Sequence, residues 1–210
     1  MKTNDQPPTT KHKTIRFLLA ILLQSVLILV VPAQAIYTRL SGQTVILQTR
    51  PVDPMDLLRG NYQVLDYEIS RVENLQLLPG WPEILTLQRN GESILVEGTQ
   101  FFVILQAPAS PQRDLRPPQS WIPVEIRRSR PENLGRDRVA LAGRYRDGAL
   151  IYDLERYYMP EAQIQEINNR IANLQNQPGQ EGSFVVEVKI DREGEAVPVS
   201  LWVGPQRYQF

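Results

Sequence analysis

The stretch Phe184-Val185-Val186-Glu187-Val188-Lys189-Ile190 decides the fold class of this chain, together with residues 197–203 that follow it. In both runs apolar residues recur at every second position, which is the side-chain period of a β-strand with one buried face. The turn between them, residues 191–194, ends in Gly194, which readily adopts a positive φ. The sequence therefore predicts a C-terminal β-hairpin. On its second strand the expected buried face carries Val197, Val199, Leu201 and Val203.

Similar β-rich runs, bounded by Gly, Pro, Asn or Asp, occur throughout the chain after residue 42. They predict strands at residues 43–48, 84–88, 94–97, 101–106, 122–127 and 138–145. Two dipeptides supply the paired positive-φ residues of type I′ turns. Asn90-Gly91 predicts a hairpin between 84–88 and 93–97, and Asp147-Gly148 predicts one between 138–145 and 149–154.

One helix interrupts this β pattern, near residues 160–176. Pro160 suits the first helical position, and apolar residues then recur at helical spacing: Ile164, Ile167, Ile171 and Leu174. The expected fold class is mainly β, between all-β and α+β, with an antiparallel β-rich domain and this single amphipathic helix. The Pro-rich residues 107–118 cannot form a helix or a central strand. They are either a long loop or a linker that subdivides the domain at 36–210.

The N-terminal part of the chain carries a membrane-targeting pattern. Basic residues in the tail, 1–16, precede an apolar segment at 17–35. As a helix this segment rises roughly 28 Å, close to the ~30 Å hydrocarbon thickness of a bilayer. The positive-inside rule places the tail in the cytoplasm and residues 36–210 outside it. The inner (cytoplasmic) membrane is the expected location.

The sequence allows two fates for this apolar segment, retention as an anchor or cleavage as a signal peptide. A retained helix would be a single-pass anchor that embeds the chain in the lipid bilayer. Alternatively, Pro32 can end the helix, and Ala33-Gln34-Ala35 has the small-x-small form of a signal-peptidase site. Cleavage after Ala35 would release a secreted protein.

Composition excludes several chemistries. The chain has no cysteine, and its single histidine, His12, precedes the apolar segment. Residues 36–210 therefore cannot form a Ser-His-Asp triad, a histidine or cysteine zinc site, or a thiolate nucleophile. The same residues carry nineteen basic and twenty-two acidic side chains, a net charge of −3, whereas a protein that binds nucleic acid over its surface is usually basic. No cofactor and no nucleic acid partner is expected.

The segment at residues 53–69 can be explained by local structure. Asp53 can cap a short helical turn that Gly60 ends in a left-handed conformation. In the strand expected after it, Leu65, Tyr67 and Ile69 share one face. Leu65 and Tyr67 are therefore expected in the hydrophobic core.

This segment also resembles the signature from which the GDYXXLXY family takes its name. The matching residues are Gly60, Tyr62, Leu65 and Tyr67, preceded by a similar lead-in that ends at Arg59. Asn61 stands where the family pattern has Asp. A second block is similar to the family's acidic and aromatic stretch, through Tyr152, Glu155, Tyr158, Pro160 and Glu161.

The resemblance implies a bacterial, membrane-anchored protein from a family without an established activity. It also implies a partner, because such proteins are often encoded beside multi-spanning membrane proteins. It provides no catalytic residues. Asn61 fits a turn as well as Asp does but carries no charge, so we interpret this position as structural.

Carboxylate pairs are the candidates for an enzymatic function. Asp66 with Glu68, and Asp153 with Glu155, are expected at alternate positions on a strand face. Such pairs could hold a divalent cation or act as an acid and a base. No loop has the run of oxygen ligands typical of a calcium site, so no metal site is assigned, and solvated surface charge is the preferred explanation.

Arginines are dense between residues 127 and 146, and Arg127, Arg128 and Arg130 are the candidate partner-binding residues. Guanidinium groups recognise carboxylates, phosphates and lipid head groups. Two functions remain open. The favoured one is a non-enzymatic module that binds a membrane protein in the envelope, and the alternative is a carboxylate-dependent hydrolase or divalent-metal enzyme, anchored or secreted.

Overall fold

The computed structural model describes residues 10–50, 62–64, 66–88, 91–110, 114–158, 161–175 and 184–210. The chain divides into two compact units, Met1–Tyr37 and Thr38–Phe210. Each is described by itself. The first holds most of a long helix, and the second holds all the strands.

The long helix α1 covers Thr10–Ser41 and contains an apolar stretch long enough to cross a membrane. It could be a membrane span or a signal sequence. Pro32, which could have ended the helix, does not do so, because α1 continues for nine residues after it. Proline removes one backbone donor but leaves the other hydrogen bonds of the helix available.

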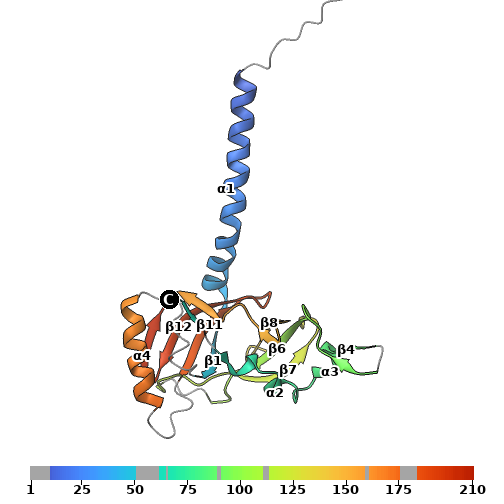
Figure 1. The fold of residues 1–210 in the computed structure, drawn as a ribbon, viewed down its shortest axis with the longest axis vertical. Coiled ribbons are helices and arrows are strands. Elements are labelled where there is room, and N and C mark those ends of the chain that lie inside the picture. The colour runs from blue at the N-terminus through green and yellow to red at the C-terminus, as the bar shows by residue number, and fades with distance from the viewer. Residues whose placement is uncertain are drawn as a thin grey trace, which may run out of the picture. The chain divides into compact units, whose positions relative to one another are not determined.

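A five-stranded sheet in the second unit has the order β13-β12-β11-β1-β3. Its strands are β1 (Gln43–Arg50), β3 (Asp66–Tyr67), β11 (Phe184–Ile190), β12 (Ala196–Val203) and β13 (Gln206–Gln209). The predicted C-terminal hairpin is confirmed, since β11 and β12 pair antiparallel and Gly194 has a φ of 93°. Figure 1 shows β1, β11 and β12 side by side. The strand β13 was not predicted.

A β-bulge in β12 changes which of its residues face the core. Glu187 pairs with Ser200, but the next residue of β11, Val188, pairs with Pro198, so Val199 is an extra residue. Leu201 and Val203 are buried as predicted, whereas Val197 and Val199 are only half-buried. The prediction of one continuous buried face was therefore wrong, because an extra residue reverses the alternation of a strand.

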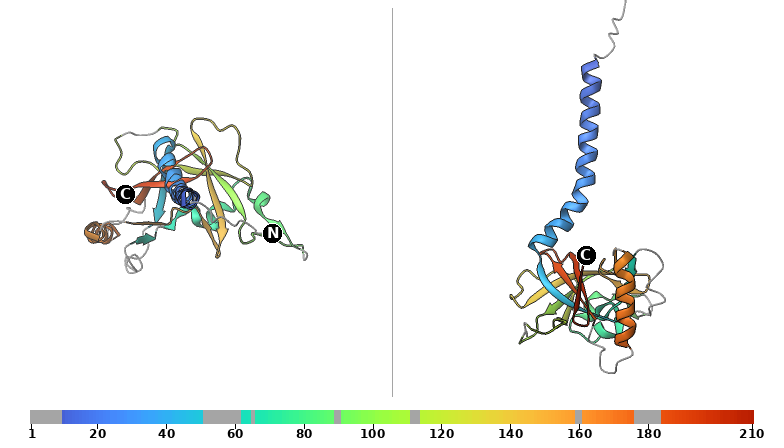
Figure 2. Two further views of the ribbon diagram at one scale, coloured as in Figure 1. Left: turned by 90° about the horizontal axis from the view of Figure 1, so that it is seen from above. Right: turned by 90° about the vertical axis from the view of Figure 1, so that its left-hand side faces the viewer.

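The second sheet has the order β7-β6-β8-β9. Its strands are β6 (Gln100–Gln106), β7 (Ile122–Arg127), β8 (Arg138–Arg146) and β9 (Ala149–Ile151). The predicted turn between β8 and β9 is confirmed, with φ values of 51° at Asp147 and 80° at Gly148. It is a separate sheet from the first. In Figure 2 its strands run from yellow-green to orange, whereas the C-terminal strands of the first sheet are red.

Shorter elements join the sheets. The predicted hairpin at 84–97 is smaller than expected: β4 (Thr86–Leu87) pairs with β5 (Ser93–Ile94), while Ile84 lies in a one-turn helix, α3 (Trp81–Ile84). Pro82 near the start of that helix favours helical over extended backbone. A 3₁₀ turn, η1 (Glu68–Ser70), and α2 (Val72–Leu75) complete this region.

One hydrophobic cluster joins both sheets. It includes Leu47 and Val186 from the first sheet, and Val103 and Leu141 from the second. The predicted helix is confirmed as α4 (Glu161–Gln175), and its Ile167 is part of the same cluster. The mainly β class with antiparallel sheets is therefore confirmed, and the described residues of the 107–118 segment form no helix or strand.

Candidate functional site

The two signature blocks lie next to each other although about ninety residues separate them in sequence. β2 (Tyr62–Val64) pairs antiparallel with β10 (Arg156–Tyr158), which sets Tyr62 opposite Tyr158. The stretch after β2 is held by β1, where Thr49 pairs with Tyr67. The fold thus brings the residues of the resemblance to one place.

Two buried tyrosines tie these blocks together in a reciprocal way. The Tyr67 hydroxyl donates to the carbonyl oxygen of Leu154 at 3.0 Å, and the Tyr152 hydroxyl donates to the carbonyl oxygen of Ile69 at 2.6 Å. All four residues are buried. We call Tyr67, Ile69, Tyr152 and Leu154 the signature junction.

The surroundings of Tyr152 are tightly packed. Its ring meets Phe101 edge-on, with centroids 6.0 Å apart and an interplanar angle of 88°. A Cβ atom on Gly143 would come within 2.7 Å of the Phe101 ring and 2.8 Å of the Tyr152 ring, so this ring pair needs glycine below it. Burial raises the pKa of Tyr152 well above its usual value, and the nearby Glu155 adds to the effect. The phenol therefore stays protonated and can donate its hydrogen bond.

Glu155 closes the loop of the second block. Its carboxylate accepts the backbone N–H of Tyr152 at 2.6 Å. Burial raises the pKa of Glu155, and this outweighs the backbone hydrogen bonds that lower it. Asp153 has a φ of 58° and pairs with Arg144. The expectation that Asp153 and Glu155 share a strand face was wrong, because both lie in the loop before β10.

The other predicted carboxylate pair does not share a strand face either. Asp66 lies in β3 and forms an ion pair with Arg71 at 2.6 Å, which raises the pKa of Arg71. Glu68 begins the 3₁₀ turn η1, so the predicted strand face through Ile69 ends at Tyr67. Tyr67 is buried as predicted, and Ile69 reaches the core from the turn instead.

Several predicted residues lie outside the described part of the chain: Arg59, Gly60, Asn61, Leu65 and Pro160, together with the turn at 53–60. For Tyr62, Tyr158 and Glu161 the backbone alone is described. Among the described residues, no group of three or more His, Cys, Asp or Glu side chains could hold a metal ion.

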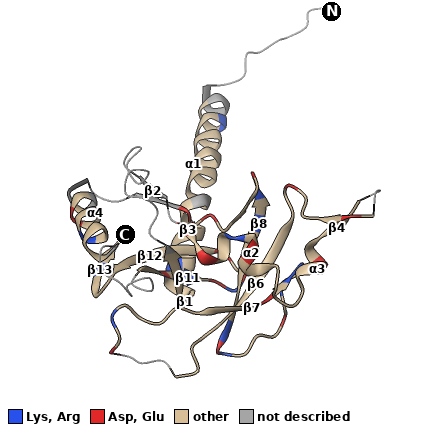
Figure 3. Cartoon of the chain, turned by 60° about the horizontal axis from the view of Figure 1, so that its bottom comes forward, with Lys and Arg blue, Asp and Glu red and all other residues tan. Residues whose placement is uncertain are grey.

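The candidate arginines follow the end of β7. Arg127 forms an ion pair with Glu125 at 2.7 Å. Arg128 and Arg130 are exposed and form no ion pair with any described residue. Figure 3 colours the backbone positions of the charged residues, and the acidic and basic positions alternate along the described elements. Two guanidinium groups are therefore available to an acidic partner.

A small pocket of about 140 Å³ adjoins the signature junction at Tyr152. Its polar lining residues other than Tyr152 are Gln100, Arg144, Asp153, Glu193 and Glu195. Since Arg144 already pairs with Asp153, the pocket presents two exposed glutamates and a satisfied ion pair. These two glutamates are candidate groups for the enzyme alternative.

Sequence reasoning missed a polar cluster at the start of the folded unit. The Thr38 hydroxyl donates to Asp191 Oδ2 at 2.5 Å, with both residues buried, and Asp191 Oδ1 accepts the backbone N–H of Glu193 and of Glu195. An aspartate beginning a turn indicates the second set of bonds. Nothing in the sequence indicates the first, since 153 positions separate the partners.

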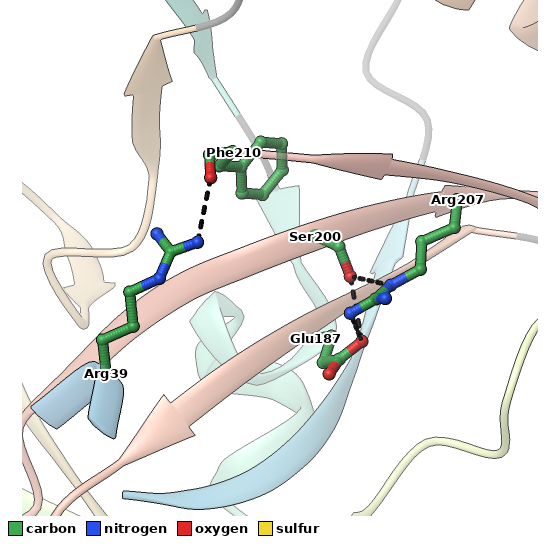
Figure 4. A network of polar contacts seen from close by, with 5 residues as sticks. All are labelled: Arg39, Glu187, Ser200, Arg207 and Phe210. Carbon is green, nitrogen blue, oxygen red and sulfur yellow. Dashed lines mark hydrogen bonds and ion pairs between the residues drawn. The ribbon is translucent and has the colours of Figure 1, made fainter. Parts of the chain in front are cut away.

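A second network missed by sequence reasoning spans the strands of the first sheet. Figure 4 shows Arg207 between Glu187 and Ser200, at 2.9 Å from each. In the same view Arg39 donates to the backbone oxygen of Phe210 at 3.1 Å. These contacts fix strand register and the start of the domain.

Comparison with known proteins identifies the family of the chain. A family model described as GDYXXLXY protein matches residues 24–201, which is most of the chain. No curated protein and no solved structure matches. The chain belongs to the GDYXXLXY family.

Proposed function

We propose that this chain is a membrane-anchored, non-enzymatic module that binds a membrane protein in the bacterial envelope through a surface that includes Arg127, Arg128 and Arg130. The observation that carries the proposal is the exposure of Arg128 and Arg130 without an acidic partner among the described residues. Exposed guanidinium groups suit carboxylates or phosphates on a partner.

The contacts of the signature residues support a binding module over an enzyme. The hydroxyls of Tyr67 and Tyr152 are bonded to backbone carbonyls in the core. The carboxylates that the sequence paired are engaged elsewhere, Asp66 with Arg71 and Asp153 with Arg144. A general acid or nucleophile needs access to substrate, and these groups already have structural partners.

The anchor is supported by the course of α1. The Ala33-Gln34-Ala35 sequence lies inside this helix, with six further helical residues up to Ser41. A retained anchor requires a continuous helix, because the hydrocarbon layer offers its backbone no other hydrogen-bond partners, and α1 is continuous. Intact mass of the chain purified from membranes tests the anchor: the uncleaved mass supports it, whereas a chain that starts at Ile36 contradicts it.

The partner is tested by capture from native membranes. The full chain should retain a membrane protein in constant stoichiometry, and reversing Arg127, Arg128 and Arg130 to Glu should abolish this capture. A charge-matched control reverses Arg116, Arg146 and Arg192, which are also exposed. Equal capture by both triple variants would refute the role of the three arginines.

The enzyme alternative has its own test. Should Mg²⁺ or Ca²⁺ bind the folded state, mass action would raise the melting temperature of the chain. The pocket glutamates provide the control, because Glu193→Gln with Glu195→Gln should then remove the increase. An increase that depends on these glutamates would favour the enzyme over the binding module.

A further inference from the structure

Two adjacent polar residues, Gln24 and Ser25, interrupt the apolar part of α1. Gln24 lies eight residues after Arg16, which is roughly 12 Å along the helix, and Arg39 follows at roughly 22 Å. If the helix spans a membrane, Gln24 therefore lies near the middle of the hydrocarbon layer, whose thickness is ~30 Å.

Gln24 and Ser25 differ in the hydrogen-bond partners that they require at that depth. A serine hydroxyl can donate to the carbonyl of its own helix four residues earlier, here Ile21. The Gln24 amide has two donor hydrogens and an acceptor oxygen, and it is exposed on the helix surface. Its side chain is too short to reach either interface, and hydrocarbon provides no hydrogen-bond partner.

We propose that Gln24 is a helix-association site that pairs with Gln24 of a second copy of this chain. This inference rests on the proposed membrane anchor. An amide is both donor and acceptor, so two copies related by a two-fold axis satisfy each other without another protein. Ala20, one turn earlier on the same face, is small and allows close approach of the two helices.

Cysteine cross-linking of the full chain in native membranes tests this geometry. The natural chain has no cysteine, so a disulfide between two copies can form only between the introduced thiols. A cross-link to another protein is distinguished by its mass, which differs from twice the mass of the chain. Ala20→Cys and Ile28→Cys lie on the Gln24 face of the helix, whereas Leu22→Cys and Val26→Cys lie on the opposite face. The first pair should form disulfide dimers on oxidation, and the second pair should not.

The contribution of the amide is measured by Gln24→Leu, which keeps side-chain size and removes the polar group. The dissociation constant of the dimer, measured in detergent or nanodiscs, should rise about tenfold, which is equivalent to about 1.4 kcal/mol. Gln34→Leu is the matched control, because Gln34 lies roughly 15 Å further along the helix, toward the interface. Its dissociation constant should stay unchanged.

Each outcome has one meaning. Cross-links on both faces or on neither, or an unchanged dimer in Gln24→Leu, would overturn the self-association. Loss of a captured membrane protein in Gln24→Leu, without any dimer, would also overturn it and assign the amide to that protein. A mass that begins at Ile36 shows failure of the anchor itself. Capture through the arginines is scored separately, so either proposal can fail alone.

Discussion

Removing one hydroxyl at a time from the signature junction should destabilise the fold by a predictable amount. In Tyr152→Phe the carbonyl of Ile69 loses its donor in a buried site, and in Tyr67→Phe the carbonyl of Leu154 does. An unsatisfied buried polar group costs about 1–3 kcal/mol. Each variant should lose about that much free energy of unfolding, a large share of the ~5–15 kcal/mol typical of a folded domain.

The two losses should not add. Both hydrogen bonds join the same two segments, so breaking one loosens the segment that the other holds, and the double variant should lose less than the sum by at least about 0.5 kcal/mol. Denaturant unfolding of the full chain in detergent, followed by tryptophan fluorescence, measures these differences. Tyr145→Phe is the matched control, because the half-buried Tyr145 makes no hydroxyl hydrogen bond with the described residues. If the junction variants lost no more stability than this control, the structural reading of the signature would be refuted.

Three further changes have clear expected results. Burial raises the pKa of Glu155 above its usual 4.5, so its contribution to stability is full below pH 4.5 and is lost as pH rises through the folded-state pKa. In unfolding curves, Glu155→Gln should therefore gain stability relative to wild type as the pH rises above 4.5. Gly80→Ala would place a Cβ atom 1.8 Å from a carbonyl oxygen of β7, at a residue whose φ is 86°. Gly91 has a similar φ of 87°, but a Cβ atom there would have open space, so Gly91→Ala should lose only about 1–3 kcal/mol of stability. Thermal melts should show a far larger loss of stability for Gly80→Ala. Thr38→Val breaks the buried bond to Asp191 and should cost about 1.5–3 kcal/mol in denaturant unfolding, whereas Thr38→Ser should restore most of it.

Periodic patterns and turn dipeptides predicted most of the second unit. Strict alternation in residues 184–190 identified β11, and Asp147-Gly148 located the turn between β8 and β9, because these signals depend only on neighbouring residues. The bulge at Val199 escaped prediction for the same reason. It lies in β12, which pairs with β11 on one side and with β13 on the other. The sequence of β12 alone does not indicate the register of these two pairings.

The candidate site was harder to predict, because its contacts connect distant parts of the chain. Alternation placed Tyr67 in the core, but its partner Leu154 lies 87 positions away. The strand face assumed for Asp66 and Glu68 failed because the chain enters a 3₁₀ turn after Tyr67, which brings Ile69 to the hydroxyl of Tyr152. The alternating pattern predicts a strand position for Ile69, and it contains no information about the hydrogen bond that Ile69 accepts from Tyr152 instead.

The last tyrosine of the family signature is Tyr67, and its contacts explain why such a motif need not mark a reactive site. A tyrosine hydroxyl in the core must be bonded, and here both available partners are main-chain carbonyls of the opposite block. The two blocks therefore stabilise each other, and the role of a residue at the signature junction is to maintain this pairing. Recognition of another molecule requires polar groups that still lack a partner. Among the described residues, the exposed guanidinium groups after β7 and the amide within α1 are polar groups of this kind, and the two proposed binding surfaces are built on them.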